Sequence, residues 1–495
     1  MQDQENLSEI DIENQKIIDN KELNIWEALI PVIILMAMLA YNIFLKDGEW
    51  LGEYSNQFIL LIGAAIASIV GFNKGIMFKQ MIDSVSSNIK SITGAILILL
   101  FVGALSGTWL LSGIIPTMIY YGLQILHPTI FLPSCLIICA IISISTGSSW
   151  TTSATVGIAL IGVGRDSEIP EGMVAGAVIS RAYFGDKLSP LSDTTNLAPA
   201  VSGSNLFTHI KYLTITTIPT VIITLIILSL INLFTISSGP TDHQYLLKTI
   251  GNTFNITPLL FIVPLIVVFM IFKKTPPLIA LFVGTVLGGI FAVIFQSSVI
   301  NGISGDTEMT FNSAYQTVLN SMTTETSIDS GNSVLNDLFN SGGMKGMLNT
   351  IWLVICAMVF GGIMESIGAL EKISSSLLKL GKSTFSIFAS TVGSCLAINL
   401  TASDQYLSIV IPGKMFSKAF KDKSLAPENL SRTLEDSGTV TSVLIPWNTC
   451  GAYHSGVLGV SVGEYFIYAI FNWLSPFTTL LFAAFRIKIR LLAAK

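Results

Sequence analysis

Long apolar runs dominate the hydrophobic pattern of this chain. A membrane-spanning helix needs roughly 20 consecutive apolar residues, and eight runs approach or exceed that length. They cover residues 27–45, 56–73, 92–126, 207–235, 257–273, 277–299, 349–371 and 463–485. Each run predicts a transmembrane helix, and together they predict an all-α polytopic membrane protein.

Four further apolar stretches are interrupted by Gly, Ser, Thr, Asn and Pro. They cover residues 129–165, 169–205, 384–419 and 428–462. Irregular backbone at membrane depth is stable only where protein or water covers its free N–H and C=O groups. These stretches therefore predict hairpins and broken helices that line a transport route.

The charge content supports a lipid environment. Of the 495 residues, 51% are hydrophobic and only 12% are charged, about half of the roughly 25% found in a soluble domain. The net charge of −5 resides in an acidic N-terminal segment, and the rest of the chain is balanced. The sequence contains no basic patch interleaved with aromatic residues, so it gives no indication of nucleic-acid binding. The expected surroundings are a lipid bilayer.

The placement of lysine and arginine predicts the orientation, because cytoplasmic loops carry an excess of both. Basic residues occur in the segments 74–90, 372–382 and 486–490. The loops 46–55 and 300–348 are acidic and are expected outside. This pattern predicts that both termini lie in the cytoplasm. The expected location of the protein is the plasma membrane. The run 92–126 then crosses from inside to outside, and 349–371 crosses in the opposite direction.

The two halves of the chain repeat the same order of features. A long run is followed by a stretch with a Ser/Thr-rich tip, a basic turn and a proline-interrupted stretch. The landmarks recur at an offset of 254 to 257 residues, as Ser149/Ser403, Arg165/Lys421, Pro170/Pro427 and Pro190/Pro446. Because the leading runs cross in opposite directions, the pattern predicts an inverted-topology repeat, an architecture of secondary transporters.

The repeat divides the chain into five parts. We expect an acidic cytoplasmic tail, a group of N-terminal transmembrane helices, a first transport repeat, a linking region with an acidic extracellular loop, and a second transport repeat. Their boundaries, in that order, are 1–25, 26–90, 91–235, 236–346 and 347–490.

Carboxylates in the interrupted stretches are the candidate ion-binding groups, because a charge inside a bilayer costs about 2.5–3.5 kcal/mol or more. Asp193 has the richest oxygen neighbourhood, since it is flanked by Ser192, Thr194, Thr195 and Asn196. Hydroxyl, amide and freed carbonyl oxygens can complete the shell of Na⁺ around one carboxylate. The alternative for Asp193 is a helix N-cap, where Asp is common.

The second repeat offers a corresponding set. Asp404, beside Ser403, falls at the position that matches Trp150, and it either binds Na⁺ or caps a hairpin turn. Asn448 and Thr449 mirror the Asp193 region and are expected to supply uncharged oxygen ligands.

Two pairs of neighbouring charges complete the candidate set. Asp436 and Glu435 are adjacent but would project in different directions from a helix, so they are not expected to share one proton. We expect Asp436 to bind a cation or proton and Glu435 to take part in gating or charge pairing. Asp186 and Lys187 lie near the cytoplasmic end of a span and predict an interfacial ion pair or gate.

Two arginines in these stretches cannot lose their protons. Arg181 and Arg432 are therefore each expected to neutralise a buried acid. Glu365, in the middle of a long run, is expected either to pair with a basic residue such as Arg181 or to act in gating.

No motif predicts an enzyme or a cofactor. The chain contains neither H-E-x-x-H nor G-x-x-x-x-G-K-[ST], which excludes the common zinc-protease and phosphate-loop signatures. His454 either responds to pH or is a packing histidine. Five cysteines in apolar segments are expected to be buried thiols, and these are Cys135, Cys139, Cys356, Cys395 and Cys450.

The segment from Ser180 to Pro199, SRAYFGDKLSPLSDTTNLAP, resembles the NhaC family of sodium/proton antiporters. The stretches Gly361–Glu365 and Pro446–Thr449 support the resemblance, which covers nearly the whole chain after the tail. It implies the ion-transporter superfamily, in which two inverted repeats each contain a re-entrant hairpin and a broken helix. Relatives carry a Ser-Asn-Thr motif there, whereas this chain has Asp193 in place of Asn, which favours a bare cation.

The resulting hypothesis is a Na⁺/H⁺ antiporter that extrudes Na⁺ by alternating access. A buried carboxylate centred on Asp193 would hold either a proton or Na⁺, since desolvation favours its neutral form. Na⁺ is expected at Asp193 and Asp404. By analogy with the superfamily, we expect the hairpins and broken helices to move against a scaffold of the remaining spans, and we expect this scaffold to form a homodimer. The alternative is a Na⁺/H⁺-coupled exchanger of organic acids, such as malate or lactate, or of amino acids.

Overall fold

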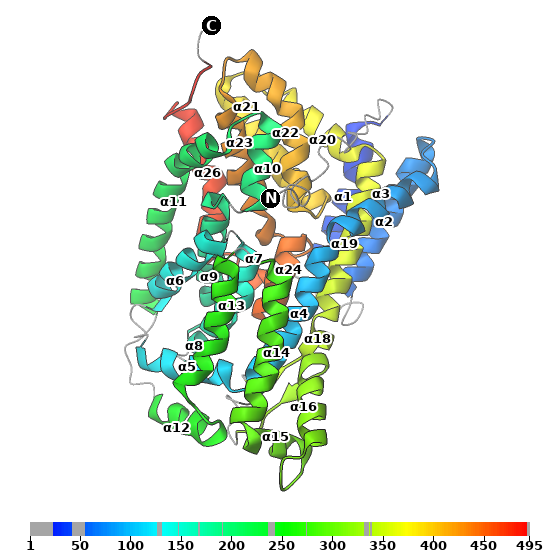
Figure 1. Cartoon of the computed structure of the whole chain (residues 1–495). Coiled ribbons are helices and arrows are strands. Elements are labelled where there is room, and N and C mark those ends of the chain that lie inside the picture. The colour runs from blue at the N-terminus through cyan, green and yellow to red at the C-terminus, as the bar shows by residue number, and fades with distance from the viewer. Residues whose placement is uncertain are drawn as a thin grey trace.

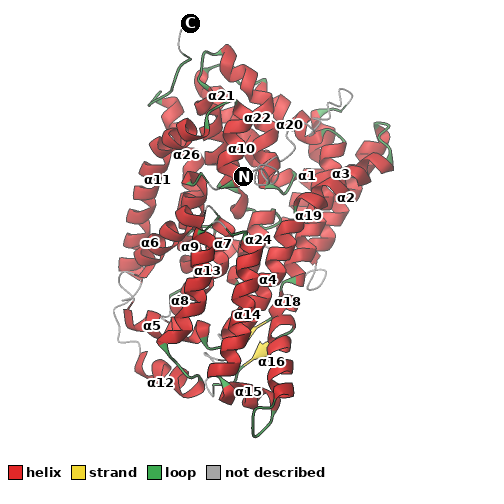
Figure 2. Cartoon of the chain, viewed as in Figure 1, coloured by secondary structure: helices red, strands yellow, loops and turns green. Residues whose placement is uncertain are grey.

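The computed structural model describes residues 23–41, 55–125, 131–146, 148–166, 169–190, 192–235, 243–273, 275–330, 336 and 339–492. The acidic segment before residue 23 and most of the loop 46–55 lie outside the described residues. The described chain is built from helices, and its one sheet is a two-residue antiparallel pair, β1 (Thr326–Ser327) and β2 (Asn340–Ser341) (Figure 2).

Three N-terminal helices pack beside the second repeat. They are α1 (Ile25–Ala40), α2 (Ser55–Asn73) and α3 (Phe78–Ser91). Both α2 and α3 contact the long helix α19 (Leu348–Ser366). An apolar cluster that includes Leu35, Leu60 and Phe360 forms this contact.

The first repeat contains a hairpin followed by a broken helix. Its elements are α4 (Thr93–Leu111), α5 (Ile114–Ile125), α6 (Phe131–Thr146), α7 (Ser149–Thr152), the π-helix η3 (Ser153–Gly157), α8 (Ile158–Asp166), α9 (Glu171–Leu188), α10 (Asp193–Ser202) and α11 (Leu206–Thr235). Hairpin 1 consists of α6 and the α7–η3–α8 arm. The break between α9 and α10 is break 1.

The second repeat has the same order. Its elements are α19, α20 (Ala369–Leu378), α21 (Thr384–Thr401), α22 (Gln405–Asp422), α23 (Pro427–Leu434), the π-helix η5 (Glu435–Thr439), the 3₁₀ turn η6 (Ser442–Leu444), α24 (Thr449–Leu458), α25 (Val462–Tyr465) and α26 (Ile470–Ala484). Hairpin 2 consists of α21 and α22. The irregular segment between η5 and α24 is break 2.

The repeats are joined by shorter elements. These are α12 (His243–Thr253), the 3₁₀ turn η4 (Pro258–Phe261), α13 (Ile262–Phe272), α14 (Pro277–Phe295), α15 (Ser297–Ser304), α16 (Phe311–Thr323), the β1–β2 pair and α18 (Gly343–Gly346). Among the described residues, five helices are long and apolar enough to cross a membrane, or seven if two bent pairs each count as one span. Exposed apolar side chains on α11 and α14, including Ile226, Phe234, Phe282 and Ile294, suit contact with lipid.

Two of the expected spans are interrupted. The run 92–126 is two helices, because Gly113 has a left-handed backbone (φ +75°) that ends α4. The run 349–371 is likewise divided at Gly368 (φ +74°). Hydropathy continues through both glycines, so the apolar pattern alone did not reveal these breaks.

The helix N-caps show which residues of the two repeats correspond to each other. Ser148 and Asp404 are the N-caps of the second arms of the hairpins, and Ser192 and Asn448 are the N-caps that follow the breaks. Both pairs lie 256 residues apart. Asp404 therefore corresponds to Ser148, and the expected match to Trp150 was wrong by two residues.

The two hairpins enter the molecule from opposite ends. In Figure 1, hairpin 1 and α5 lie in the lower part of the structure, whereas α20, α21 and α22 lie in the upper part. The arrangement is reciprocal, since α10 packs against α22 of hairpin 2 and α24 packs against η3 of hairpin 1. The structure is thus an all-α membrane protein with two inverted repeats, re-entrant hairpins and broken helices.

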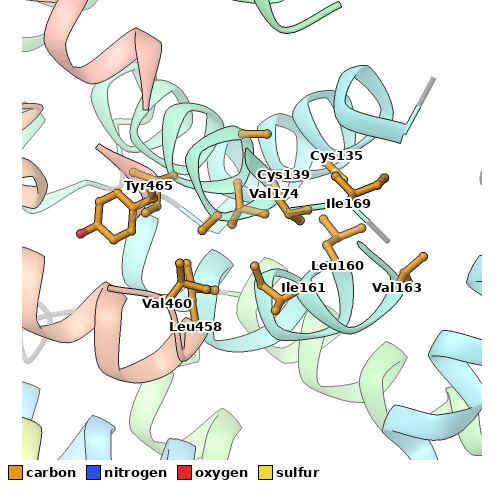
Figure 3. Close-up of a cluster of buried hydrophobic side chains, with 14 of the residues drawn as sticks. Cys135, Cys139, Leu160, Ile161, Val163, Ile169, Val174, Leu458, Val460 and Tyr465 are labelled. Carbon is orange, nitrogen blue, oxygen red and sulfur yellow. The ribbon is translucent and has the colours of Figure 1, made fainter. Parts of the chain in front are cut away.

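Apolar packing joins the repeats around hairpin 1. Figure 3 shows Cys139 of α6 beside Val174 of α9 and Cys135 beside Ile169, with Leu458 and Tyr465 of the second repeat in the same cluster. As expected, all five cysteines are buried.

Candidate ion-binding site

The junction between hairpin 1 and break 1 is organised by the buried carboxylate of Asp186, and we call it junction 1. Asp186 lies in the last turn of α9 and is 6% exposed. The Ser149 hydroxyl donates to its Oδ2 at 2.6 Å, and the Ser192 hydroxyl donates to its Oδ1 at 2.5 Å. One carboxylate therefore links the tip of the hairpin to the start of α10.

Further oxygens lie around break 1. The Thr194 hydroxyl is 3.2 Å from the Ser192 hydroxyl. The Thr195 hydroxyl donates to the main-chain oxygen of Asp186 at 2.8 Å. The Asn196 amide donates to the carbonyls of Pro190 and Ser192 at 2.9 and 2.7 Å. The break exposes a polar cluster next to one negative charge, which is the chemistry of a cation site.

Asp193 lies apart from this cluster. It is the first residue of α10, its side chain is exposed, and Ser192 occupies the N-cap position instead. The Tyr406 hydroxyl of α22 donates to Asp193 Oδ2 at 3.5 Å. Asp193 thus faces hairpin 2. The acid that the hydroxyls of junction 1 surround is Asp186 instead.

The tip of hairpin 2 meets break 2 at junction 2. The Thr449 N–H donates to the Ser403 carbonyl at 2.9 Å, and Ser403 has a left-handed backbone (φ +60°). Asp404 is 5% exposed and caps α22 by accepting from the Leu407 N–H at 3.0 Å. The Ser403 hydroxyl is buried and has no hydrogen-bond partner among the described residues.

Amides support junction 2 from behind. The Asn448 side chain donates to the Asn399 carbonyl and to its Oδ1, both at 3.2 Å. Asn399 in turn donates to the Gly438 carbonyl at 2.7 Å and to the Thr441 hydroxyl at 3.1 Å. Because Asn399 is in α21, this network fixes the hairpin to both sides of break 2.

Glu365, at the end of α19, lies on the scaffold side of junction 2. It is half-buried, and the Asn88 amide of α3 can donate to its Oε2 at 3.2 Å. Asp404 is close enough to act on it electrostatically.

A buried ion pair connects the two broken helices. The Lys187 ammonium of α9 contacts Asp436 Oδ1 of η5, and neither side chain is exposed. The hydroxyls of Thr216 in α11 and Thr479 in α26 donate to Asp436 Oδ2. Both oxygens of Asp436 are therefore engaged within the protein.

The Na⁺/H⁺ antiporter family matches residues 181–487. The chain is 36% identical over 462 residues to the Na⁺/H⁺ antiporter NhaC of Alkalihalophilus pseudofirmus, covering 93% of this chain and 96% of that protein. This chain belongs to the Na⁺/H⁺ antiporter family.

Other proteins that are similar to this chain have names with different substrates. The malate-2H⁺/Na⁺-lactate antiporter of Bacillus subtilis is 35% identical, over 91% of this chain and 92% of that protein. The arginine/ornithine antiporter ArcD of Halobacterium salinarum is 32% identical, over 91% of this chain and 90% of that protein. The resemblance to NhaC that the motifs predicted is confirmed.

Seen in this antiporter's structure, the predicted site residues form two groups. Junction 1 gathers Asp186, Ser192, Thr194, Thr195 and Asn196, and junction 2 gathers Ser403, Asp404, Asn448 and Thr449. Asp193 lies beside hairpin 2. Asp436 belongs to neither junction, because its oxygens are occupied by Lys187 and two threonines.

Three expected charge pairs are wrong. Lys187 pairs with Asp436 and not with Asp186, because the two helix interruptions bring residues 249 positions apart together. Arg181 and Arg432 have no carboxylate within ion-pair distance among the described residues, so Arg181 does not pair with Glu365. Their guanidinium groups instead lie over the rings of Phe184 (4.9 Å) and Tyr212 (4.5 Å).

Sequence reasoning missed four contributors to these contacts. Ser149 is the hairpin donor to Asp186, Tyr406 faces Asp193, and Thr216 and Thr479 hold Asp436. Ser149 belongs to the Ser/Thr-rich tip that the sequence marked as a landmark of the first repeat, which was the available signal for its role. Nothing in the apolar runs of α11 and α26 marks Thr216 or Thr479.

His454 is a packing histidine in this structure. Its Nδ1 is 2.9 Å from the Ser153 hydroxyl, and its ring lies against Tyr453 and Tyr183.

Proposed function

We propose that this chain exchanges Na⁺ for H⁺ across the plasma membrane, extruding Na⁺ while protons enter, with both termini in the cytoplasm. Membership of the family supports this activity. The observation that carries the site is Asp186, a buried carboxylate that receives hydroxyls from both the hairpin tip and the helix break.

Junction 1 has the chemistry for a dehydrated Na⁺. A hydroxyl that donates to a carboxylate can turn its hydrogen away and offer a lone pair to a cation. Ser149, Ser192 and Thr194 could then join one Asp186 oxygen around Na⁺. We assign Na⁺ primarily to this junction.

Junction 2 is proposed as a second cation position. Asp404 has the required buried charge, and the unpartnered Ser403 hydroxyl is a free oxygen ligand. Asp404 would then be both a helix cap and a Na⁺ ligand, which combines the two alternatives that the sequence left open for this residue. Each junction includes the tip of a hairpin, so a junction can move only together with its hairpin. Alternating access would therefore displace the hairpins and breaks against the remaining spans. We expect these remaining spans to form the contact of a homodimer.

Organic-substrate exchange is the second candidate function. The malate-2H⁺/Na⁺-lactate and arginine/ornithine antiporters support this candidate. Their sequence identity to this chain and the share of it that they cover are close to those of NhaC. Such an exchanger would use the same junctions for coupling ions and would require a further ligand for transport.

Purified protein in liposomes distinguishes the two functions. Vesicles that are acidic inside and contain a pH-reporting dye receive external NaCl alone, or NaCl with malate, lactate or arginine. Na⁺/H⁺ exchange predicts that NaCl alone dissipates the pH gradient and that KCl at equal concentration does not. A response only in the presence of an organic substrate would overturn it in favour of the second candidate.

A further inference from the structure

Glu435 is a fully buried carboxyl group that the two junctions do not use. It is the first residue of η5 and is 0% exposed. Neither of its oxygens has a hydrogen-bond partner among the described residues. The adjacent Asp436 is held by Lys187, Thr216 and Thr479. Two neighbouring carboxyls thus have opposite environments.

The environment of Glu435 determines its protonation state in this conformation. An ionised carboxylate in a low-dielectric interior without a partner is too costly to persist, and such a group becomes neutral instead. Na⁺ would need several oxygen ligands, and the nearby Thr439 hydroxyl forms no hydrogen bond to Glu435 among the described residues. Glu435 is therefore suited to hold a proton and not a metal cation.

The charges around Glu435 would respond to loss of that proton. Asp186 and Lys187 of α9 and its neighbour Asp436 are close enough to act on it electrostatically. Four of the other elements that contact η5 carry ionisable groups. These are Asp193 on α10, Cys395 on α21, Glu428 and Arg432 on α23, and Tyr406, Lys414, Lys418, Lys421 and Asp422 on α22. A negative Glu435 would compete with Asp436 for Lys187.

That competition acts on the contact between the repeats. Lys187 belongs to the broken helix of repeat 1, and Asp436 to that of repeat 2. A weaker Lys187–Asp436 pair would loosen the link between these helices and alter the turn that carries Asp186. The π-helix starts at Glu435, and π-helical turns are frequent at functional sites.

The repeat shows that the fold does not require an acid here. With the 256-residue correspondence, Glu435 matches Ile179 of α9, which is also fully buried. An apolar side chain fills the equivalent place in repeat 1. The carboxyl in repeat 2 therefore serves a purpose other than packing.

We propose that Glu435 carries the counter-transported proton at a place separate from the Na⁺ junctions, and that Lys187 transmits its charge to the two broken helices. The proton passes between the Glu435 carboxyl and water when the conformation opens, and no covalent bond other than O–H changes. This inference rests on the proposed Na⁺/H⁺ exchange.

The test measures two activities of the full-length protein in liposomes. One is Na⁺-driven proton flux, and the other is exchange of radioactive Na⁺ for Na⁺ at constant pH, which needs no net proton movement. For Glu435→Gln we expect loss of proton flux with Na⁺/Na⁺ exchange retained. Glu435→Asp should restore proton flux with a shifted pH profile. The matched control is Glu428→Gln, an acid of the preceding helix α23 that pairs with the exposed Arg490, and it should match the wild type in both assays.

The outcomes separate this inference from the proposed function. If the wild type shows no Na⁺-driven proton flux, the proposed function itself fails. If the wild type is active and Glu435→Gln keeps its proton flux, the inference alone is wrong. It is also wrong if Glu435→Gln, with unchanged thermal unfolding, loses Na⁺/Na⁺ exchange too, because Glu435 would then belong to the Na⁺ site.

Discussion

At the scale of single residues, the candidate site is centred on the acid that receives hydrogen bonds from surrounding hydroxyls, and not on the acid with the most polar sequence neighbours. Asp193 had the most promising sequence neighbourhood, but its side chain points toward α22 and is exposed. Those same neighbours, Ser192 and Thr195, instead contact Asp186 and its main chain. The polar residues that follow break 1 therefore contact a carboxylate in the last turn of the helix before the break.

Removing the hairpin hydroxyl tests this arrangement. Ser149→Ala should raise the half-saturating Na⁺ concentration about tenfold, because a hydrogen bond to a charged group contributes about 1.5–3 kcal/mol and 1.4 kcal/mol is a factor of ten. The measurement is Na⁺-driven proton flux against Na⁺ concentration. Ser202→Ala is the matched control, since that buried hydroxyl donates to the Pro199 carbonyl within α10. Equal effects of both substitutions would remove Ser149 from the site.

The residue types of the site were predictable from the sequence, but their pairing was not. Polar residues inside apolar stretches identify both junctions, because burial of such groups demands a reason. Contacts between repeats depend on how the breaks turn the chain. Lys187 therefore pairs with a residue 249 positions away instead of with its neighbour.

At the scale of elements, a fully buried ion pair links α9 of the first repeat to η5 of the second. Breaking one side of a buried ion pair leaves an unpaired charge and costs about 3–5 kcal/mol, whereas neutral replacement of both partners is often tolerated. This asymmetry makes the role of the pair measurable apart from transport.

We expect Lys187→Met to lower the thermal unfolding temperature of the purified protein strongly, and Lys187→Met combined with Asp436→Asn to recover most of the loss. Arg165→Met breaks the half-exposed pair with Glu171 and should have a much smaller effect, because solvent screens such pairs. A double variant as unstable as the single one would show that the ammonium stabilises the fold by other contacts.

The course of the elements was largely readable from the apolar pattern and prolines. Breaks 1 and 2 contain Pro190 and Pro446, as expected for residues that interrupt helices. The divisions at Gly113 and Gly368 were not readable, because a left-handed glycine changes the backbone without changing hydropathy. The hairpin tips were placed within two residues.

At the scale of the whole molecule, the two repeats approach one another from opposite ends and exchange contacts at their centres. Each half-helix after a break packs against the opposite hairpin, as α10 does with α22 and α24 with η3. A movement of one hairpin is therefore transmitted to the other repeat. Alternating access follows from this reciprocity if the hairpins move together.

The inverted repeat predicts opposite exposure of equivalent positions. In intact cells, a membrane-impermeant maleimide should label a Cys in place of Arg165 and leave a Cys in place of Lys421 unlabelled until the membrane is permeabilised. The native cysteines provide a low background because all five are buried. Labelling of both positions from the same side would contradict the inverted topology.

The central claim is that Asp186 holds the transported Na⁺, and Na⁺-driven proton flux in liposomes tests it most directly. Wild type, Asp186→Asn and Asp193→Asn are compared at equal protein density and over a range of Na⁺ concentrations. Removing the buried charge of Asp186 should abolish the Na⁺ response, whereas Asp193→Asn should still respond at higher Na⁺. An Asp186→Asn protein that dissipates the pH gradient like the wild type would contradict the account.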